Sequence, residues 1–224
     1  MSQELIHVYL MPGMCASPKI FEHIKLPEPQ FKIHYLEWII PLANESLSAY
    51  AIRMTTFIEH TNVVLLGVSF GGVLVQEMAK HLKVRKLIIV SSVKSNRELP
   101  KRMQAAKITK AYKILPVQLV SNIDMLAKYA FGKGIAKRIE LYKKYLSVKD
   151  VNYLTWAIEQ MICWDQEEVL NPEIVHIHGD NDAVFPIKYI NNCTVVKNGS
   201  HIMIISKYKW FNEHLPSIIL EAHK

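Results

Sequence analysis

Cysteine is scarce in this sequence and is not arranged in pairs. The three cysteines among its 224 residues, Cys15, Cys163 and Cys193, lie far apart and form no C-x-x-C motif. This number and spacing argue against both a disulfide framework and a zinc site built on cysteine. The sequence therefore indicates a reducing compartment, and we expect a cytoplasmic protein.

Long apolar runs are also absent. No stretch approaches the roughly 20 apolar residues of a membrane-spanning helix, so stable membrane insertion is not expected. The first apolar segment, residues 5–14, follows Glu4 and no basic cluster, which argues against a signal peptide. Half of the residues are hydrophobic, and the length suits one sizeable domain whose core needs no disulfide bonds.

Acidic residues are sparse in one region of the chain. Residues 94–149 contain fourteen lysines or arginines but only three acids, Glu98, Asp124 and Glu140, and the formal net charge of the whole chain is +7. Such a region is typical of a solvated face on surface helices. Alternatively, it attracts an anionic substrate or an acidic surface. No recognisable binding module accompanies the basic residues, so nucleic acid is not an expected partner.

Glycine is infrequent too, but two of the eight glycines frame a serine. Residues 63–68 form a short apolar run typical of a β-strand, and apolar residues recur at helical spacing from residue 74. The chain therefore passes from a strand into a helix at Ser69, which forces a strained backbone. Gly67 and Gly71 remove the Cβ atoms that would clash beside this bend. A serine framed by two glycines also fits an ordinary loop between a strand and a helix. Whether Ser69 has a chemical role therefore depends on possible partner residues elsewhere in the chain.

Strands and helices alternate on both sides of this turn. Other strands are expected at residues 5–10, 32–38, 85–91, 173–178 and 193–196, and helices at residues 46–60, 72–82 and after 204. This alternation predicts a parallel sheet with helices on both faces. The carboxyl ends of its strands meet at one edge, where ligands of such sheets bind.

The alternation stops between residues 93 and 171. This segment has no convincing buried strand and carries only helical patterns, at residues 103–115, 118–131 and 135–146. Long insertions between sheet strands are often functional. The segment is either a cover over the ligand-binding edge or a set of further packing helices.

The pentapeptide Gly67-Val68-Ser69-Phe70-Gly71, a G-x-S-x-G nucleophile elbow in this order of elements, resembles the α/β-hydrolase family. The resemblance implies an α/β fold with a parallel sheet of about six strands flanked by helices. It implies that residues 1–92 and 172–224 form the core and that residues 93–171 are a helical lid inserted into it.

The resemblance also implies a catalytic triad. The family carries its acid in a turn bracketed by a glycine and a proline, which selects Asp182; the rival, Asp180, lies too early in that turn. The family places its base on the loop after the last strand, which selects His201. Ser69, Asp182 and His201 occur in the family's chain order, each just after an expected strand.

Two backbone amides are the candidate oxyanion donors. In the family, the strand that corresponds to residues 5–10 ends in a His-Gly turn. The backbone N–H after that glycine is one of the two donors to the oxyanion. Here Pro12 replaces the histidine and Gly13 is in register, which selects Met14. Phe70, next to the nucleophile, supplies the other N–H. A simple Pro-Gly turn at the end of a strand is the alternative interpretation.

A second constellation, H-x-H-x-D, places His176 and His178 on one face of a strand with Asp180 just beyond. It resembles part of a metallo-hydrolase ligand set, but no histidine follows Asp180 and too little chain remains for a second half. We expect no metal site and interpret the pair as packing and hydrogen-bonding residues. Most of the other histidines are expected to be surface or core residues without a chemical role, including His7, His23, His34, His60, His81, His214 and His223.

The predicted protein is a serine hydrolase that cleaves a carboxylic ester or thioester of a small to medium acyl compound through an acyl-enzyme. No metal or organic cofactor is expected, and whether the substrate is anionic stays open. A non-catalytic ligand-binding protein of the same fold is the second hypothesis. A C–C hydrolase, a lyase or an acyltransferase would use the same triad. The oligomeric state is not predicted.

Overall fold

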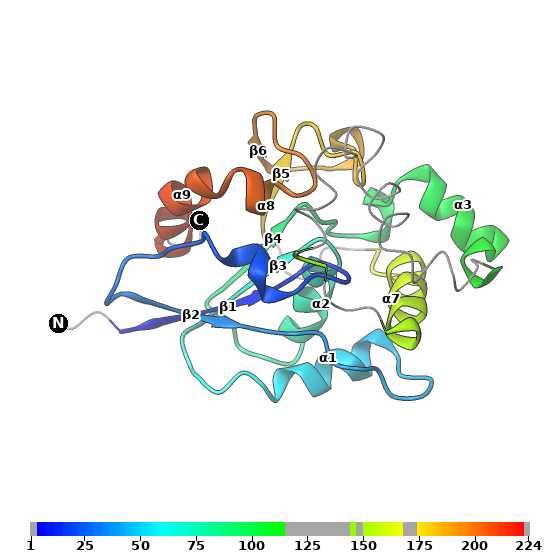
Figure 1. The fold of residues 1–224 in the computed structure, drawn as a ribbon, viewed down its shortest axis with the longest axis horizontal. Helices are drawn as coiled ribbons and strands as arrows, with labels where there is room; N and C mark the ends of the chain where they lie inside the picture. Colours follow the sequence, from blue (N-terminus) through cyan, green and yellow to red (C-terminus); the bar gives the residue numbers. More distant parts are fainter. Residues whose placement is uncertain (1–3, 115–143, 147–149, 168–173, 222–224) are drawn as a thin grey trace.

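A parallel sheet organises the molecule (Figure 1). The computed structural model describes residues 4–114, 144–146, 150–167 and 174–221. Within them, six strands pair in the order β2-β1-β3-β4-β5-β6, and every pairing is parallel. The sheet expected from the sequence is therefore confirmed. The strands are β1 (Ile6–Met11), β2 (Phe31–Tyr35), β3 (Val63–Val68), β4 (Lys86–Val90), β5 (Val175–Gly179) and β6 (Thr194–Val196).

The strand order places a change of winding direction beside β1. From β1 the chain moves to the edge strand β2, then crosses back to β3 and continues outward to β6. Met11 and Gly67 are aligned partners at the ends of β1 and β3. The loops that follow these two strands therefore diverge from one point of the carboxyl edge, where open α/β sheets bind ligands.

Helices cover both faces of the sheet. Alternate residues of each strand face opposite sides, so neighbouring residues of one strand pack against different helices. Tyr9 and Leu65 join one core cluster with α1 and α2, whereas Val8 and Val64 join a second cluster with α8 and α9. Figure 1 shows these helices on opposite sides of the strands. The described helices are η1 (Pro18–Phe21), α1 (Leu47–Thr55), α2 (Phe70–Ala79), η2 (Asn96–Glu98), α3 (Lys101–Thr109), η3 (Ala111–Ile114), α7 (Val151–Cys163), η5 (Ile187–Tyr189), α8 (Met203–Ser206) and α9 (Tyr208–Leu220).

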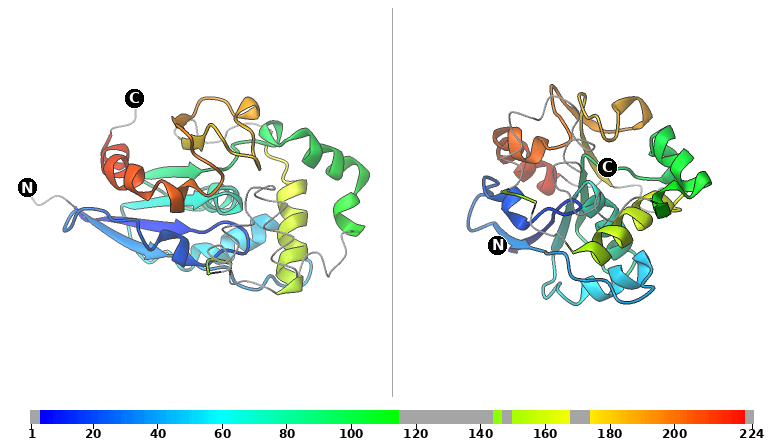
Figure 2. Two further views of the ribbon diagram at one scale, coloured as in Figure 1. Left: turned by 45° about the horizontal axis from the view of Figure 1, so that its top comes forward. Right: turned by 45° about the vertical axis from the view of Figure 1, so that its right-hand side comes forward.

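Two helices of the segment between β4 and β5 lie beyond the carboxyl ends of the strands. The left view of Figure 2 shows α3 and α7 there. α7 packs against α2 and α3, and its residues Tyr153 and Trp156 belong to the core cluster of α1 and α2. The helix expected at residues 118–131 lies outside the described residues, as does most of the one expected at 135–146. α7 therefore contributes to the core as well as extending over the sheet edge.

The ends of several elements differ from those expected. β2 stops at Tyr35, the last residue paired with β1, whereas the sequence pattern extends to Trp38. α1 begins after Ser46 as expected, and the Ala49 N–H donates to the Ser46 hydroxyl. The C-terminal helix is divided into α8 and α9 at Lys207, whose dihedral angles are not helical. In the part of the chain that is described, no helix is long and apolar enough to span a bilayer.

Candidate active site

Ser69 occupies the turn between β3 and α2 and has a strained backbone. Its φ of 54° and ψ of −122° lie outside the regions that non-glycine residues favour. The Ser69 N–H still donates to the Val90 carbonyl of β4 at 2.9 Å, so the end of the sheet holds the turn. The Ser69 side chain is partly exposed. This geometry presents the hydroxyl at the carboxyl edge of the sheet.

Close backbone approach explains the two glycines that frame the serine. A Cβ atom on Gly67 would clash with the Gly71 carbonyl, and a Cβ atom on Gly71 would clash with the Pro12 carbonyl. The second glycine thus allows the start of α2 to lie against the loop that follows β1. Gly67 is thus needed for the turn itself, and Gly71 for the contact with the loop after β1.

The structure brings the side chains of Ser69, His201 and Asp182 into one hydrogen-bonded chain. His201 Nε2 lies 2.9 Å from Ser69 Oγ. His201 Nδ1 lies 2.9 Å and 3.1 Å from the two carboxylate oxygens of Asp182. The Asp182 side chain is fully buried, whereas that of His201 is 11% exposed. A base is thus positioned at the hydroxyl, with a carboxylate at its opposite nitrogen.

The turn after β5 holds the carboxylate of Asp182 in place. Its Oδ1 accepts hydrogen bonds from the N–H groups of Val184 at 2.8 Å and Phe185 at 2.9 Å. Burial acts to raise the pKa of Asp182, but the charge and hydrogen bond of His201, together with the Phe185 N–H, outweigh it and lower the pKa. Asp182 is therefore ionised at neutral pH and can stabilise a protonated imidazole.

The loops that carry the acid and the base are joined through their backbones. The Asn181 N–H donates to the Gly199 carbonyl at 2.9 Å. Gly179 and Gly199 approach so closely that a Cβ atom on either would clash with the backbone of the other. Of the two acids on this turn, Asp180 is exposed, whereas Asp182 is buried against the histidine ring. The structure therefore brings Asp182, the acid preferred from the sequence, to His201.

The two candidate oxyanion donors also lie at this edge. A Cβ atom on Gly13 would lie 3.4 Å from Ser69 Cβ, so the loop that carries Met14 packs against the elbow. Among the described residues, neither the Met14 N–H nor the Phe70 N–H has a hydrogen-bond acceptor. Phe70 is the first residue of α2, where backbone amides lack helical partners and the helix dipole favours negative charge. Both amides therefore keep their hydrogen-bonding capacity at this edge of the sheet.

Two supporting residues escaped the sequence analysis. Trp38 Nε1 donates to the Gly13 carbonyl at 2.8 Å, and its ring stacks on Phe70 with centroids 5.2 Å apart. Ser92 Oγ donates to the Ser69 carbonyl at 2.7 Å. The position of Ser92 just after a strand beside β3 was an available signal, whereas the sequence around Trp38 carries none.

His176 and His178 form a buried hydrogen-bonded pair behind the acid turn. His176 Nε2 lies 3.1 Å from His178 Nδ1, and His178 Nε2 lies 2.8 Å from the Phe185 carbonyl. Desolvation is the main cause that lowers the pKa of His176 to about 2, and it also lowers the pKa of His178. Both rings are therefore neutral at pH 7. They support the Asp182 turn through packing and hydrogen bonding.

Comparison with known proteins identifies the fold. No protein-family model and no curated protein matches the sequence. A bromoperoxidase from Bacillus anthracis matches with a TM-score of 0.72 at 18% identity, over 97% of this chain and 93% of that one. An esterase from Exiguobacterium antarcticum matches with a TM-score of 0.71 at 20% identity, over 96% and 92%. A hydrolase from Pseudomonas aeruginosa PA01 gives 0.71 at 15% identity, over 98% and 92%.

These similarities define the class of protein at the level of its fold. The chain has the α/β-hydrolase fold, as its six-stranded parallel sheet and its strand-to-helix elbow together indicate. Other solved structures that match it include carboxylesterases and a lipase-esterase related protein.

Proposed function

We propose that this protein is a serine hydrolase that cleaves a carboxylic ester or thioester of a small to medium acyl compound. The observation that carries the proposal is the continuous hydrogen-bonded chain from Ser69 through His201 to Asp182. The strained elbow and the two amides without acceptors fit the same chemistry. Esterases and hydrolases among the structures of the same fold agree with it.

Each residue has a defined step in the proposed reaction. His201 takes the hydroxyl proton as Ser69 Oγ attacks the substrate carbonyl, because a neutral serine is a weak nucleophile. Asp182 orients the imidazole and stabilises its cation. The N–H groups of Met14 and Phe70 bind the oxyanion. His201 then donates its proton to the leaving alcohol or thiol, and it later activates the water that releases the acid from the acyl-enzyme.

The proposal extends to residues 93–171 as a helical lid over a core formed by residues 1–92 and 172–224. Arg102 of α3 donates to the carbonyls of Ala183 and Val184 at 3.1 Å and 2.9 Å, which attaches α3 to the acid turn. α3 and α7 both lie beyond the carboxyl ends of the strands (Figure 2). In this proposal, a segment attached to the acid turn would cover the acyl group of the substrate.

Covalent labelling tests the proposed nucleophile. A serine-directed fluorophosphonate is expected to label the wild-type protein at one residue, and short p-nitrophenyl esters are expected to be hydrolysed. Ser69→Ala is expected to abolish labelling and to lower kcat by at least a thousandfold, because the triad acts as a unit. His201→Ala is expected to lower kcat to a similar extent. Mass spectrometry of the labelled peptide identifies the modified residue.

Ser48→Ala is the matched control, because Ser48 is an exposed serine on α1. This variant is expected to keep wild-type labelling and turnover. Folded wild-type protein that binds a substrate ester without labelling or turnover would favour the non-catalytic ligand-binding hypothesis. Labelling that survives Ser69→Ala would assign the chemistry to another serine.

A further inference from the structure

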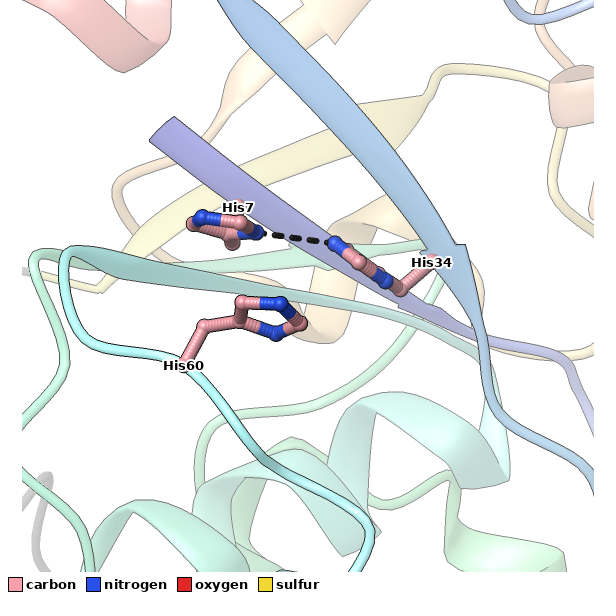
Figure 3. Close-up of side chains that lie close together, drawn as sticks. All are labelled: His7, His34 and His60. Atoms are coloured by element: carbon pink, nitrogen blue, oxygen red, sulfur yellow. Dashed lines mark hydrogen bonds between the residues drawn. The ribbon is translucent and has the colours of Figure 1, made fainter. Parts of the chain in front are cut away.

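Three histidines from separate segments meet beside β1 and the edge strand β2. His7 lies in β1, His34 in β2, and His60 in the connection between α1 and β3. One ligand nitrogen from each ring lies within 4.8 Å of those of the other two, and all three residues are half-buried. Figure 3 shows the three rings grouped together. We call this group the histidine cluster.

Two nitrogens of the histidine cluster lie nearly as close as in a metal site. His7 Nδ1 and His34 Nε2 are joined by a hydrogen bond 2.9 Å long, so the ring that donates must change its tautomer before both nitrogens bind a metal. Two nitrogens on a tetrahedral zinc ion lie about 3.3 Å apart, given Zn–N bonds of about 2.0–2.1 Å. The rings of His7 and His60 are stacked with centroids 3.8 Å apart. A metal ion lies in the plane of each imidazole that binds it, so binding requires the half-buried His60 ring to tilt out of this stack about its hydrogen bond to Tyr9.

Tyr9 is placed to orient His60 as a ligand. The buried Tyr9 hydroxyl lies 2.6 Å from His60 Nδ1 and accepts the Glu59 N–H at 3.2 Å. When the phenol oxygen accepts from Nδ1–H, the lone pair of His60 is on Nε2. Figure 3 shows a nitrogen of His60 on the side of its ring that faces His7 and His34. Metal-binding histidines commonly have such a partner on the other ring nitrogen.

The charges around the histidine cluster are of both signs. Desolvation, followed by the neighbouring His60 and Lys32, lowers the pKa of His7. Desolvation and the same two neighbours, together with His7, also lower the pKa of His34, and Glu59 acts against them. Lys32 repels a cation at this place, whereas the carboxylate of Glu59 attracts one.

We propose that the histidine cluster binds one Zn²⁺ ion or a similar late transition-metal ion, with water completing the coordination. Imidazole nitrogen is a preferred ligand of Zn²⁺, Cu²⁺ and Ni²⁺. The metal joins the edge strand β2 and the connection before β3 to β1, and so stabilises the sheet. Val63, the partner of His7, lies about 20 Å along β3 from Ser69 at about 3.3 Å per residue. The proposed metal role is therefore structural and independent of the proposed hydrolysis.

Titration of chelator-treated, full-length protein with Zn²⁺ tests this site. Isothermal titration calorimetry is expected to give one bound ion per chain. Co²⁺ in place of Zn²⁺ is expected to give the visible absorption of a four-coordinate site with three imidazole ligands and water. A Zn²⁺ concentration of about 100 times Kd is expected to raise Tm by about 5 to 10 °C, because only the folded protein presents the site. His34→Gln is expected to weaken binding at least tenfold and to remove the Tm increase.

Two further variants make the test specific. Tyr9→Phe keeps all three ligands and is expected to weaken binding by roughly tenfold, the usual effect of losing a partner of a ligand histidine. His81→Gln removes an exposed histidine outside the cluster and is expected to leave binding unchanged. If circular dichroism shows metal-free His34→Gln unfolded, His60→Gln replaces it. Absence of Zn²⁺ binding, or binding that survives both ligand substitutions, would overturn the proposal. These experiments measure metal binding and not ester hydrolysis, so an absence of Zn²⁺ binding would leave the proposed triad unaffected.

Discussion

Two aspartates only two residues apart have very different environments. Asp182 is buried, accepts two backbone N–H groups and faces His201, whereas Asp180 is exposed. The sequence favoured Asp182 through the spacing of the flanking glycine and proline. The structure shows the physical basis of that spacing, because the turn directs only the later side chain inward. Its catalytic role stays a prediction.

Replacement of this acid tests the role directly. Asp182→Asn is expected to lower kcat by about a thousandfold to ten-thousandfold, because an amide cannot stabilise the imidazolium and favours the wrong tautomer of His201. The measurement is kcat for a p-nitrophenyl ester, with circular dichroism to check folding. Asp180→Asn is the control and is expected to change kcat less than twofold. The assignment would be wrong if the folded Asp182→Asn protein kept more than a tenth of the wild-type kcat.

At the scale of elements, the end of β4 supports the elbow at the end of β3. The Ser92 hydroxyl donates to the Ser69 carbonyl, and a Cβ atom on Gly72 would lie 2.5 Å from Ser92 Oγ. The neighbouring Ser91 is also buried, but its hydroxyl has no hydrogen-bond partner among the described residues. Of two adjacent buried serines after one strand, only Ser92 has a hydroxyl that is hydrogen-bonded to the elbow.

Paired substitutions measure that interaction. Ser92→Ala is expected to lower the free energy of unfolding by about 1 kcal/mol, the usual net value of one hydrogen bond, and to lower kcat a few-fold because the elbow is less firmly held. Ser91→Ala removes the buried hydroxyl that makes no such bond and is expected to be neutral or slightly stabilising. Urea denaturation of both variants gives the comparison. Equal losses from the two substitutions would mean that the hydrogen bond to Ser69 contributes nothing.

Strands were easier to predict than element ends. All six strands were expected from the sequence. The inner strands β1, β3, β4 and β5 are largely buried and therefore apolar, whereas the edge strands β2 and β6 are partly exposed and carry mixed patterns. The ends depend on partners that the sequence does not display, such as the end of β1 pairing at Tyr35. Likewise, the helical pattern expected after residue 204 continues through Lys207, whereas the backbone breaks there.

At the scale of the whole molecule, the triad residues and the histidine cluster were unequally predictable. Ser69, Asp182 and His201 each follow a strand within a recognisable local pattern, so their meeting could be predicted. The histidine cluster has no such pattern. Its members come together because strand pairing aligns Tyr9 with His34 and His7 with Val63. Each of these histidines stands alone in the sequence, without a motif, and none was expected to have a chemical role.

The distribution of charge over the molecule gives the last prediction. The segment between β4 and β5 is rich in Lys and Arg, and its described helix α3 lies at the carboxyl edge, opposite the end that carries α9 (Figure 1). If the segment attracts an anionic substrate, kcat/KM for an ester with an anionic head group exceeds that for a neutral ester of equal chain length. This advantage is expected to fall roughly threefold to tenfold between about 0.05 M and 0.5 M salt, because salt screens exposed charges.

Charge reversal at two places separates attraction near the site from net charge. Lys101→Glu with Lys113→Glu changes exposed residues of α3 and η3 and is expected to lower kcat/KM for the anionic ester a few-fold at low salt. Lys25→Glu with Lys209→Glu changes the net charge equally, but Lys209 lies on α9 and Lys25 donates its N–H to Asn212 of that helix. This pair is expected to have little effect. Equal effects of the two pairs, or no preference for the anionic ester at low salt, would mean that the basic segment is only a solvated face.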